Sequence, residues 1–101
     1  MNVENYEQLF QDANSAAEAF AIIDKIRDSK NLENYEIALL LGLNPKQRNY
    51  EKRKAGAGNQ YSRLKYRTKI TPRIIREAIR VAGLSNAEIR AELSKIKASA
   101  A

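Results

Sequence analysis

Apolar side chains recur at steps of three and four residues along most of this chain of 101 residues, and no other feature constrains its fold as strongly. Such spacing places apolar residues on one face of an α-helix. Near the N-terminus it runs from Val3 to Ala13, and Ser15 followed by Glu18 is typical of the start of a second helix. The spacing therefore predicts a small, mainly helical domain of five or six helices.

The middle of the chain is expected to form two more helices joined by a turn. Residues 32–41 are apolar on most sides, which predicts a central helix, and Gly42 suits a left-handed cap at its end. Asn44 followed by proline then suits the start of the next helix, an almost wholly polar one over residues 46–54. The glycines of residues 55–59 are expected to end it in a flexible stretch.

A different period follows between Arg63 and Ile70, where basic residues alternate with apolar or β-branched ones. This two-residue period predicts one short basic β-strand or hairpin, a wing or ribbon, with its basic side facing outward. The side chains expected to face the core are Leu64, Tyr66, Thr68 and Ile70. Thr71 followed by proline, and Ser85 followed by Glu88, then predict the starts of two final helices.

The distribution of charge indicates a partner that is a polyanion. The chain carries a net charge of +6. Residues 1–45 hold three bases and eight acids, a net charge of −5, whereas residues 46–80 hold twelve bases and two acids, a net charge of +10. Charges scattered evenly would indicate an ordinary solvated surface, but this asymmetry is typical of a nucleic-acid-binding protein.

The residue types that the chain lacks exclude several kinds of chemistry. There is no cysteine and no histidine, which excludes disulfides, thiolate zinc sites, cysteine nucleophiles and imidazole bases. We therefore expect no enzymatic activity, no metal and no cofactor. The acidic start of the sequence is unlike a signal peptide, and no apolar run approaches the roughly 20 residues of a membrane helix. A cytoplasmic location without membrane contact is expected.

Residues 37–45 resemble the helix-turn-helix of bacterial DNA-binding proteins. They match it in the small Ala38 four residues before the turn glycine Gly42, in the aliphatic residue directly after that glycine, and in the capping Asn44. They depart from it six positions after the glycine, where the family has an aliphatic residue and this chain has Arg48. The resemblance implies a second helix whose first turn meets base edges in the major groove. The residues concerned are Lys46, Gln47, Arg48 and Asn49. A solvated basic helix or loop is the alternative interpretation.

Two further segments have related layouts. Residues 79–89 repeat the arrangement, but the helix that follows carries Glu88 and Glu92, so a helical hairpin in the core or in a dimer interface is favoured. Residues 65–93 resemble ribbon-helix-helix repressors in outline, with a basic alternating strand, a proline-started helix and a serine-capped helix. The first of these helices is shorter than in that family. This second resemblance implies that outward strand side chains contact bases.

The candidate nucleic-acid-binding residues extend through the basic segment. Besides the four at the predicted helix start, they are Lys52, Arg53, Lys54, Arg63, Lys65, Arg67, Lys69 and Arg73. Three tyrosines interleave with these bases and are expected to stack on nucleobases or to contact phosphate. They are Tyr50, Tyr61 and Tyr66. Tyr6 and Tyr35 lie on apolar helical faces and are expected in the core.

Together these patterns predict a single domain, residues 1–101, that binds double-stranded DNA sequence-specifically as a homodimer, in the manner of a small transcriptional, plasmid or phage regulator. Residues 1–45 are its acidic helical part, 46–80 its basic binding part, 81–97 its C-terminal helix and 98–101 a frayed tail. Two alternatives remain open. One is a protein that binds RNA or single-stranded nucleic acid, and the other is a phage-type inhibitor or adaptor that binds another protein.

Overall fold

The computed structural model of the chain describes residues 5–67 and 69–99. Within these residues there are six α-helices, one short 3₁₀ helix and no β-strand. In chain order they are α1 (Tyr6–Asp12), α2 (Ala16–Ser29), α3 (Asn34–Leu40), α4 (Tyr50–Arg63), η1 (Leu64–Tyr66), α5 (Pro72–Ala82) and α6 (Asn86–Ser99). The prediction of a mainly helical fold is confirmed. No helix in the described ranges is both long and apolar enough to cross a membrane.

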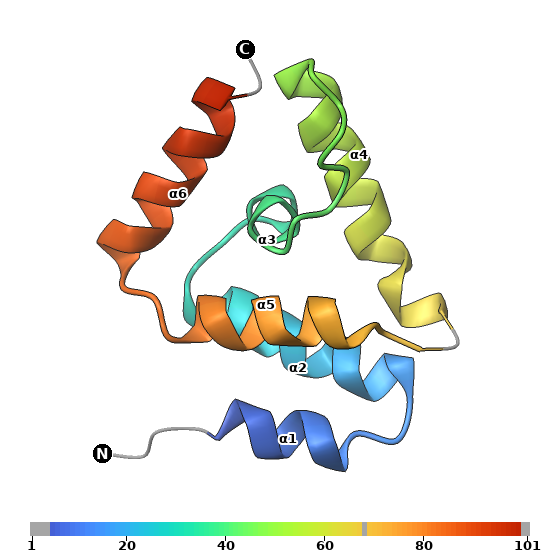
Figure 1. Cartoon of the computed structure of the whole chain (residues 1–101). Coiled ribbons are helices and arrows are strands. Elements are labelled where there is room, and N and C mark those ends of the chain that lie inside the picture. Colours follow the sequence, from blue (N-terminus) through green and yellow to red (C-terminus); the bar gives the residue numbers. More distant parts are fainter. Residues whose placement is uncertain (1–4, 68, 100–101) are drawn as a thin grey trace.

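The helices form a flat, three-sided arrangement around α3, which is seen end-on in Figure 1. The molecule measures 39 × 34 × 19 Å along its principal axes, so it is about half as thick as it is wide. Two sides of the arrangement are α4 and α6, and the third is formed by α5 together with α2 and α1 (Figure 1). The closest helix pair is α3 with α4, while η1 packs on α2.

The centre of the core is α3, because almost none of its surface faces solvent. Residues 37–41 are all buried. Gly42 follows with a φ of +79°, a left-handed conformation that strains any residue with a side chain. The predicted central helix and its glycine cap are therefore confirmed, although the helix itself begins and ends slightly inside residues 32–41.

Three predicted helix starts are confirmed by the hydrogen bonds of their caps. The Ser15 and Thr71 hydroxyls accept from the backbone N–H three residues later, at 3.1 Å and 3.4 Å, and these bonds cap α2 and α5. At α6 the bonding is reciprocal. The Glu88 N–H donates to the Ser85 hydroxyl at 3.1 Å, and the Ser85 N–H donates to the Glu88 carboxylate at 2.9 Å. Caps of this kind satisfy donors that a helix end leaves without intrahelical partners.

The polar helix predicted over residues 46–54 begins later, at Tyr50, with Asn49 as its cap. The predicted cap was Asn44, and that prediction is wrong. Asn44 has a left-handed φ of +52°, and its side-chain Nδ2 donates to the backbone oxygen of Arg53 at 3.3 Å. An N-cap needs extended backbone and a side-chain oxygen turned to its own helix, so Asn44 cannot serve as one. It instead attaches the preceding loop to the N-terminal part of α4.

The prediction that residues 55–59 form a flexible end to this helix is also wrong, because they lie inside α4. The reason is close packing. Ala57 is fully buried, and a Cβ built on Gly56 would lie 2.3 Å from Nδ2 of Asn44. Small residues let α4 approach α3 and the loop before it, and this tertiary contact outweighs the low helix propensity of glycine.

The strand predicted between Arg63 and Ile70 is not found. Arg63 ends α4, and Leu64–Tyr66 form the 3₁₀ helix η1. Ala57, Tyr61 and Leu64 are all buried and continue one apolar stripe at helical spacing of four and three residues. This stripe begins before the alternating segment, and its packing favours helical structure over a strand at Leu64. Of the four side chains expected to face the core, Leu64 and Ile70 do so, Tyr66 is exposed, and Thr68 lies outside the described residues.

Candidate nucleic-acid interface

The basic residues of the chain fall into two classes according to whether a carboxylate or a backbone oxygen of the fold binds their charged groups. One class is formed by arginines and lysines that join elements of the fold. Arg27, Lys54, Arg80 and Arg90 each pair with at least one aspartate or glutamate at 2.6 to 3.1 Å. Lys30 donates to the backbone oxygen of Leu84 at 2.8 Å. These cations are engaged in holding the helices together.

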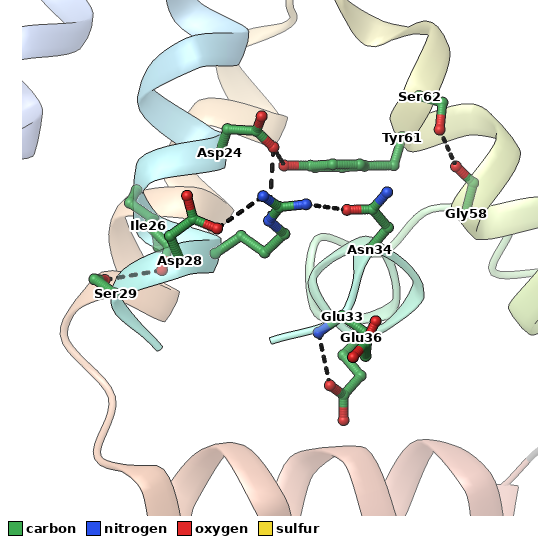
Figure 2. A network of polar contacts seen from close by, with 11 residues as sticks. Asp24, Ile26, Asp28, Ser29, Glu33, Asn34, Glu36, Gly58, Tyr61 and Ser62 are labelled. Carbon is green, nitrogen blue, oxygen red and sulfur yellow. Dashed lines mark hydrogen bonds and ion pairs between the residues drawn. The ribbon is translucent and has the colours of Figure 1, made fainter. Parts of the chain in front are cut away.

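A polar network around Arg27 connects α2, α3 and α4 (Figure 2). The Tyr61 hydroxyl donates to Asp24 at 2.6 Å, and the Arg27 guanidinium donates to Asp28 at 2.7 Å and to the side-chain oxygen of Asn34. Burial, followed by the bond to Asp24, raises the pKa of Tyr61 well above its usual range. Tyr61 therefore stays neutral at physiological pH and acts as a donor within the fold.

The pairs of Arg80 and Arg90 hold α6 against the rest of the molecule. The Arg80 guanidinium contacts Glu92 of α6 at 2.6 Å and Glu77 of its own helix at 3.0 Å. The bond to Glu92, the largest influence, helps to raise the pKa of Arg80. Arg90 contacts Glu36 of α3 at 2.8 Å, and Glu36 is the charged residue that the described core buries. A buried carboxylate needs polar partners to replace its hydration, and Glu36 has two, because its other oxygen accepts from the Glu33 N–H at 2.8 Å.

The second class has no such partner among the described residues, and five of its members lie close together in the sequence where α4 ends and α5 begins. We name this group the basic corner, and its members are Arg63, Lys65, Arg67, Lys69 and Arg73. All five are exposed, and no ion pair joins any of them to a carboxylate in the described part of the chain. Residues 63–73 contain no acid at all. The corner therefore presents five positive charges within eleven residues.

The basic corner follows the bend of the chain from α4 through η1 into α5, at the lower right of Figure 1. Arg73 lies in the first turn of α5 and reaches back towards α3, since a Cβ built on Gly42 would lie 3.3 Å from its Nη1. Lys65 lines a hollow of about 170 Å³ together with Asp24, but that carboxylate already accepts the Tyr61 hydroxyl. The positive charge of the corner is thus largely uncompensated.

The remaining predicted contact residues lie at the other end of α4. Lys46, Arg48 and Asn49 are exposed on the loop before this helix, Gln47 is half-buried there, and Lys52 is exposed on the first turn. A helix of 14 residues is about 21 Å long, so the structure separates this group from the basic corner by roughly that distance. The single basic segment predicted from the sequence is therefore two separate surfaces.

Two further predicted contact residues, Arg53 and Lys54, are half-buried. Lys54 pairs with Glu51 at 3.1 Å, and its ammonium lies 5.0 Å and 5.4 Å from the ring centroids of Tyr35 and Tyr50. Bonding to Glu51 is the largest influence that raises the pKa of Lys54. Arg53 has its Nε buried without a hydrogen-bond partner in the described structure. Neither presents a free charged group as openly as the basic corner does.

The three tyrosines predicted to contact nucleic acid have different surroundings. Tyr61 is only 1% exposed and packs on Phe20, with 5.0 Å between the ring centroids, so its predicted stacking role is wrong. Tyr50 is half-buried between Lys54 and Lys97. Tyr66 is 77% exposed at the basic corner. Tyr6 and Tyr35, predicted for the core, are half-buried and pack against it.

One exposed base was missed by the sequence analysis. Arg76 lies one turn after Arg73 on α5 and is also exposed. The signal that could have found it is the absence of any acid from Lys52 to Arg76, a longer span than the alternating segment.

The described residues hold no group of three or more acids that could bind a metal ion. Comparison with family models, with curated proteins and with solved structures finds no match to this chain.

Proposed function

We propose that this protein binds nucleic acid through the basic corner. The observation that carries the proposal is a cluster of exposed, unpaired positive charge. Arg63, Lys65, Arg67, Lys69 and Arg73 lie within eleven residues that contain no acid, and none has a carboxylate partner among the described residues. By contrast, Arg80 and Arg90 pair with glutamates of other helices. Five unpaired positive charges repel one another, which costs stability, and a polyanion bound at the corner offsets that cost. Neutralised phosphates also release counterions, which drives binding.

Double-stranded DNA bound by a homodimer is the specific form that the sequence patterns favour. The helix-turn-helix resemblance assigns base contacts to residues 46–49, which occupy the loop before α4. A duplex that touched both this loop and the basic corner would run along α4. Replacing Arg48 by alanine should then cost about 1–3 kcal/mol on a selected duplex and less on random duplexes. An equal loss on both would limit Arg48 to phosphate contact.

The salt dependence of binding tests the proposal as a whole. Each neutralised phosphate contributes about −0.9 to the slope of log K against log salt on duplex DNA, and about −0.7 on single strands. With five contacts per protomer the slope should be about −4.5 or −3.5 respectively for each protomer that binds. Fluorescence anisotropy of labelled oligonucleotides across a salt series measures it. A slope near zero would refute nucleic-acid binding by this corner.

Matched substitutions locate the contact surface. The double variant Arg63→Ala, Arg67→Ala should reduce the magnitude of the slope by about 1.4–1.8, because two phosphate contacts are lost. The control is Lys95→Ala, which also removes an exposed positive charge but lies on α6, away from the corner (Figure 1). Lys95→Ala should leave the slope unchanged within error. Equal effects of corner and control variants would mean that binding depends on net charge and not on this surface.

A further inference from the structure

Tyr66 stands apart from the other large apolar side chains that the structure describes, because it alone among them is exposed, at 77%. It lies in η1, directly between Lys65 and Arg67 of the basic corner. A single exposed tyrosine is ordinary on a protein surface. Tyr66, however, has exposed basic residues on both sides in the sequence, and it lies at the basic corner, the proposed nucleic-acid-binding surface.

The local structure keeps the ring in solvent. Leu64 is fully buried against α2 and anchors η1, so the residue two positions later is carried outward as the chain turns towards α5. The backbone of Arg67 is then extended, with φ −74° and ψ 157°, and its N–H bonds back to the Leu64 oxygen at 3.1 Å. The turn that displays Tyr66 is therefore held by its own hydrogen bond and by a buried leucine.

The chemical surroundings of the ring suit a nucleobase. The Lys65 ammonium lies 5.2 Å from the ring centroid of Tyr66, within the range of a cation–π contact. No carboxylate occurs in residues 63–73 to repel a phosphate chain beside the ring. Aromatic rings that interleave with basic residues are the usual platform for unpaired bases, because every base has a π-face and the neighbouring cations hold its phosphates.

From these observations we infer that the basic corner takes single-stranded nucleic acid and that Tyr66 stacks on an unpaired base of the bound strand. The inference rests on the proposed function, since it assigns a strand type to the same surface. In that strand type it departs from the duplex form that the sequence patterns favour. Bases inside a duplex are stacked on one another, and their faces are closed to a side chain at the protein surface. An exposed ring flanked by cations thus has a use on a single strand that it lacks on a duplex.

The test compares wild type with Tyr66→Ala and Tyr66→Phe on a dT oligonucleotide, on the same length of RNA, on a duplex, and on an oligonucleotide with abasic sites. Stacking is worth about 1–3 kcal/mol per base, so Tyr66→Ala should weaken dT binding about five- to 140-fold. Tyr66→Phe keeps the ring and should bind as wild type does. On the abasic strand, which keeps its phosphates but offers no base, Tyr66→Ala and wild type should bind equally. Comparison of RNA with dT of the same length shows whether the 2′-hydroxyl changes the affinity of the single strand.

A spectroscopic variant gives an independent readout. The chain has no tryptophan, so Tyr66→Trp introduces a single one, whose emission should be quenched by the dT strand but not by the abasic strand. Equal losses of Tyr66→Ala on dT and abasic strands, or a wild-type preference for duplex at matched salt, would overturn the inference. In either case, salt-dependent binding whose slope is reduced in the double variant Arg63→Ala, Arg67→Ala would leave the proposed function standing. If no oligonucleotide binds with a salt dependence, both fail.

Discussion

Two glycines inside α4 offer a matched test of how the loop before this helix is held. Gly56 and Gly58 are both helical, and replacing glycine by alanine inside a helix gains about 0.8–1.0 kcal/mol. Their surroundings differ. A Cβ on Gly58 would have its nearest neighbour, the Cβ of Tyr35, at 3.9 Å, whereas one on Gly56 would lie 2.3 Å from Nδ2 of Asn44.

Gly58→Ala should therefore stabilise the protein by about 1 kcal/mol, because the new methyl group fits at ordinary contact distance. For a protein of this size the melting temperature should rise by about 4–8 °C. Gly56→Ala gains the same propensity but displaces the Asn44 side chain from the Arg53 oxygen. The lost hydrogen bond and the crowding cost about 1–3 kcal/mol, so this variant should be less stable than Gly58→Ala by about that amount.

Urea unfolding followed by circular dichroism measures both variants. The decisive control is Gly56→Ala in an Asn44→Gly background, where the crowding atom is gone and glycine adopts the left-handed φ without strain. There, Gly56→Ala should recover the full gain seen for Gly58→Ala. Equal stabilisation by both single variants would refute the contact between Asn44 and α4. Destabilisation by Gly58→Ala would refute the continuity of the helix through residues 55–59.

Three further predictions concern stability. Tyr61→Phe removes the 2.6 Å bond to Asp24 and should cost about 1–2 kcal/mol. Because folding raises the pKa of Tyr61, its contribution is fully present below about pH 10, its unfolded value, and declines above it. Urea midpoints between pH 8 and 11 should fall more steeply for wild type than for Tyr61→Phe, and parallel slopes would contradict this. Leu64→Asp places a charge at a fully buried position and should cost several kcal/mol, whereas Lys65→Asp beside it should change stability by only about 0.5 kcal/mol. Equal effects would mean that η1 does not anchor the turn. Glu36→Ala removes both the capping bond to the Glu33 N–H at 2.8 Å and the pair with Arg90, and should cost about 1–3 kcal/mol by thermal unfolding. Arg90→Ala should cost less, about 1 kcal/mol or below, because the arginine is largely exposed, and the reverse order would be inconsistent with a capping role for Glu36.

The amino-acid sequence by itself determined the helical class and the starts of three of the six described α-helices. Ser15, Thr71 and Ser85 could be identified because a cap is a local device, in which a side chain bonds the backbone three residues away. The central helix could be identified for a similar reason, since a segment that is apolar on most sides must be buried. The positive charge of residues 46–80 is likewise a property of composition alone.

Features that depend on contacts between distant residues were decided only by the tertiary structure. Residues 63–70 alternate like a strand, but Leu64 belongs to a buried stripe that begins at Ala57, and packing of that stripe favours the helical structure found at residues 63–66. Asn44 has the residue type of a cap but bonds the backbone oxygen of Arg53 in α4 instead. The ion pairs between helices were also decided only by the fold, because Glu36 and Arg90 are 54 residues apart in the sequence. An ion pair depends on distance in space, and so the basic corner emerged as a distinct surface only once the helices were in place.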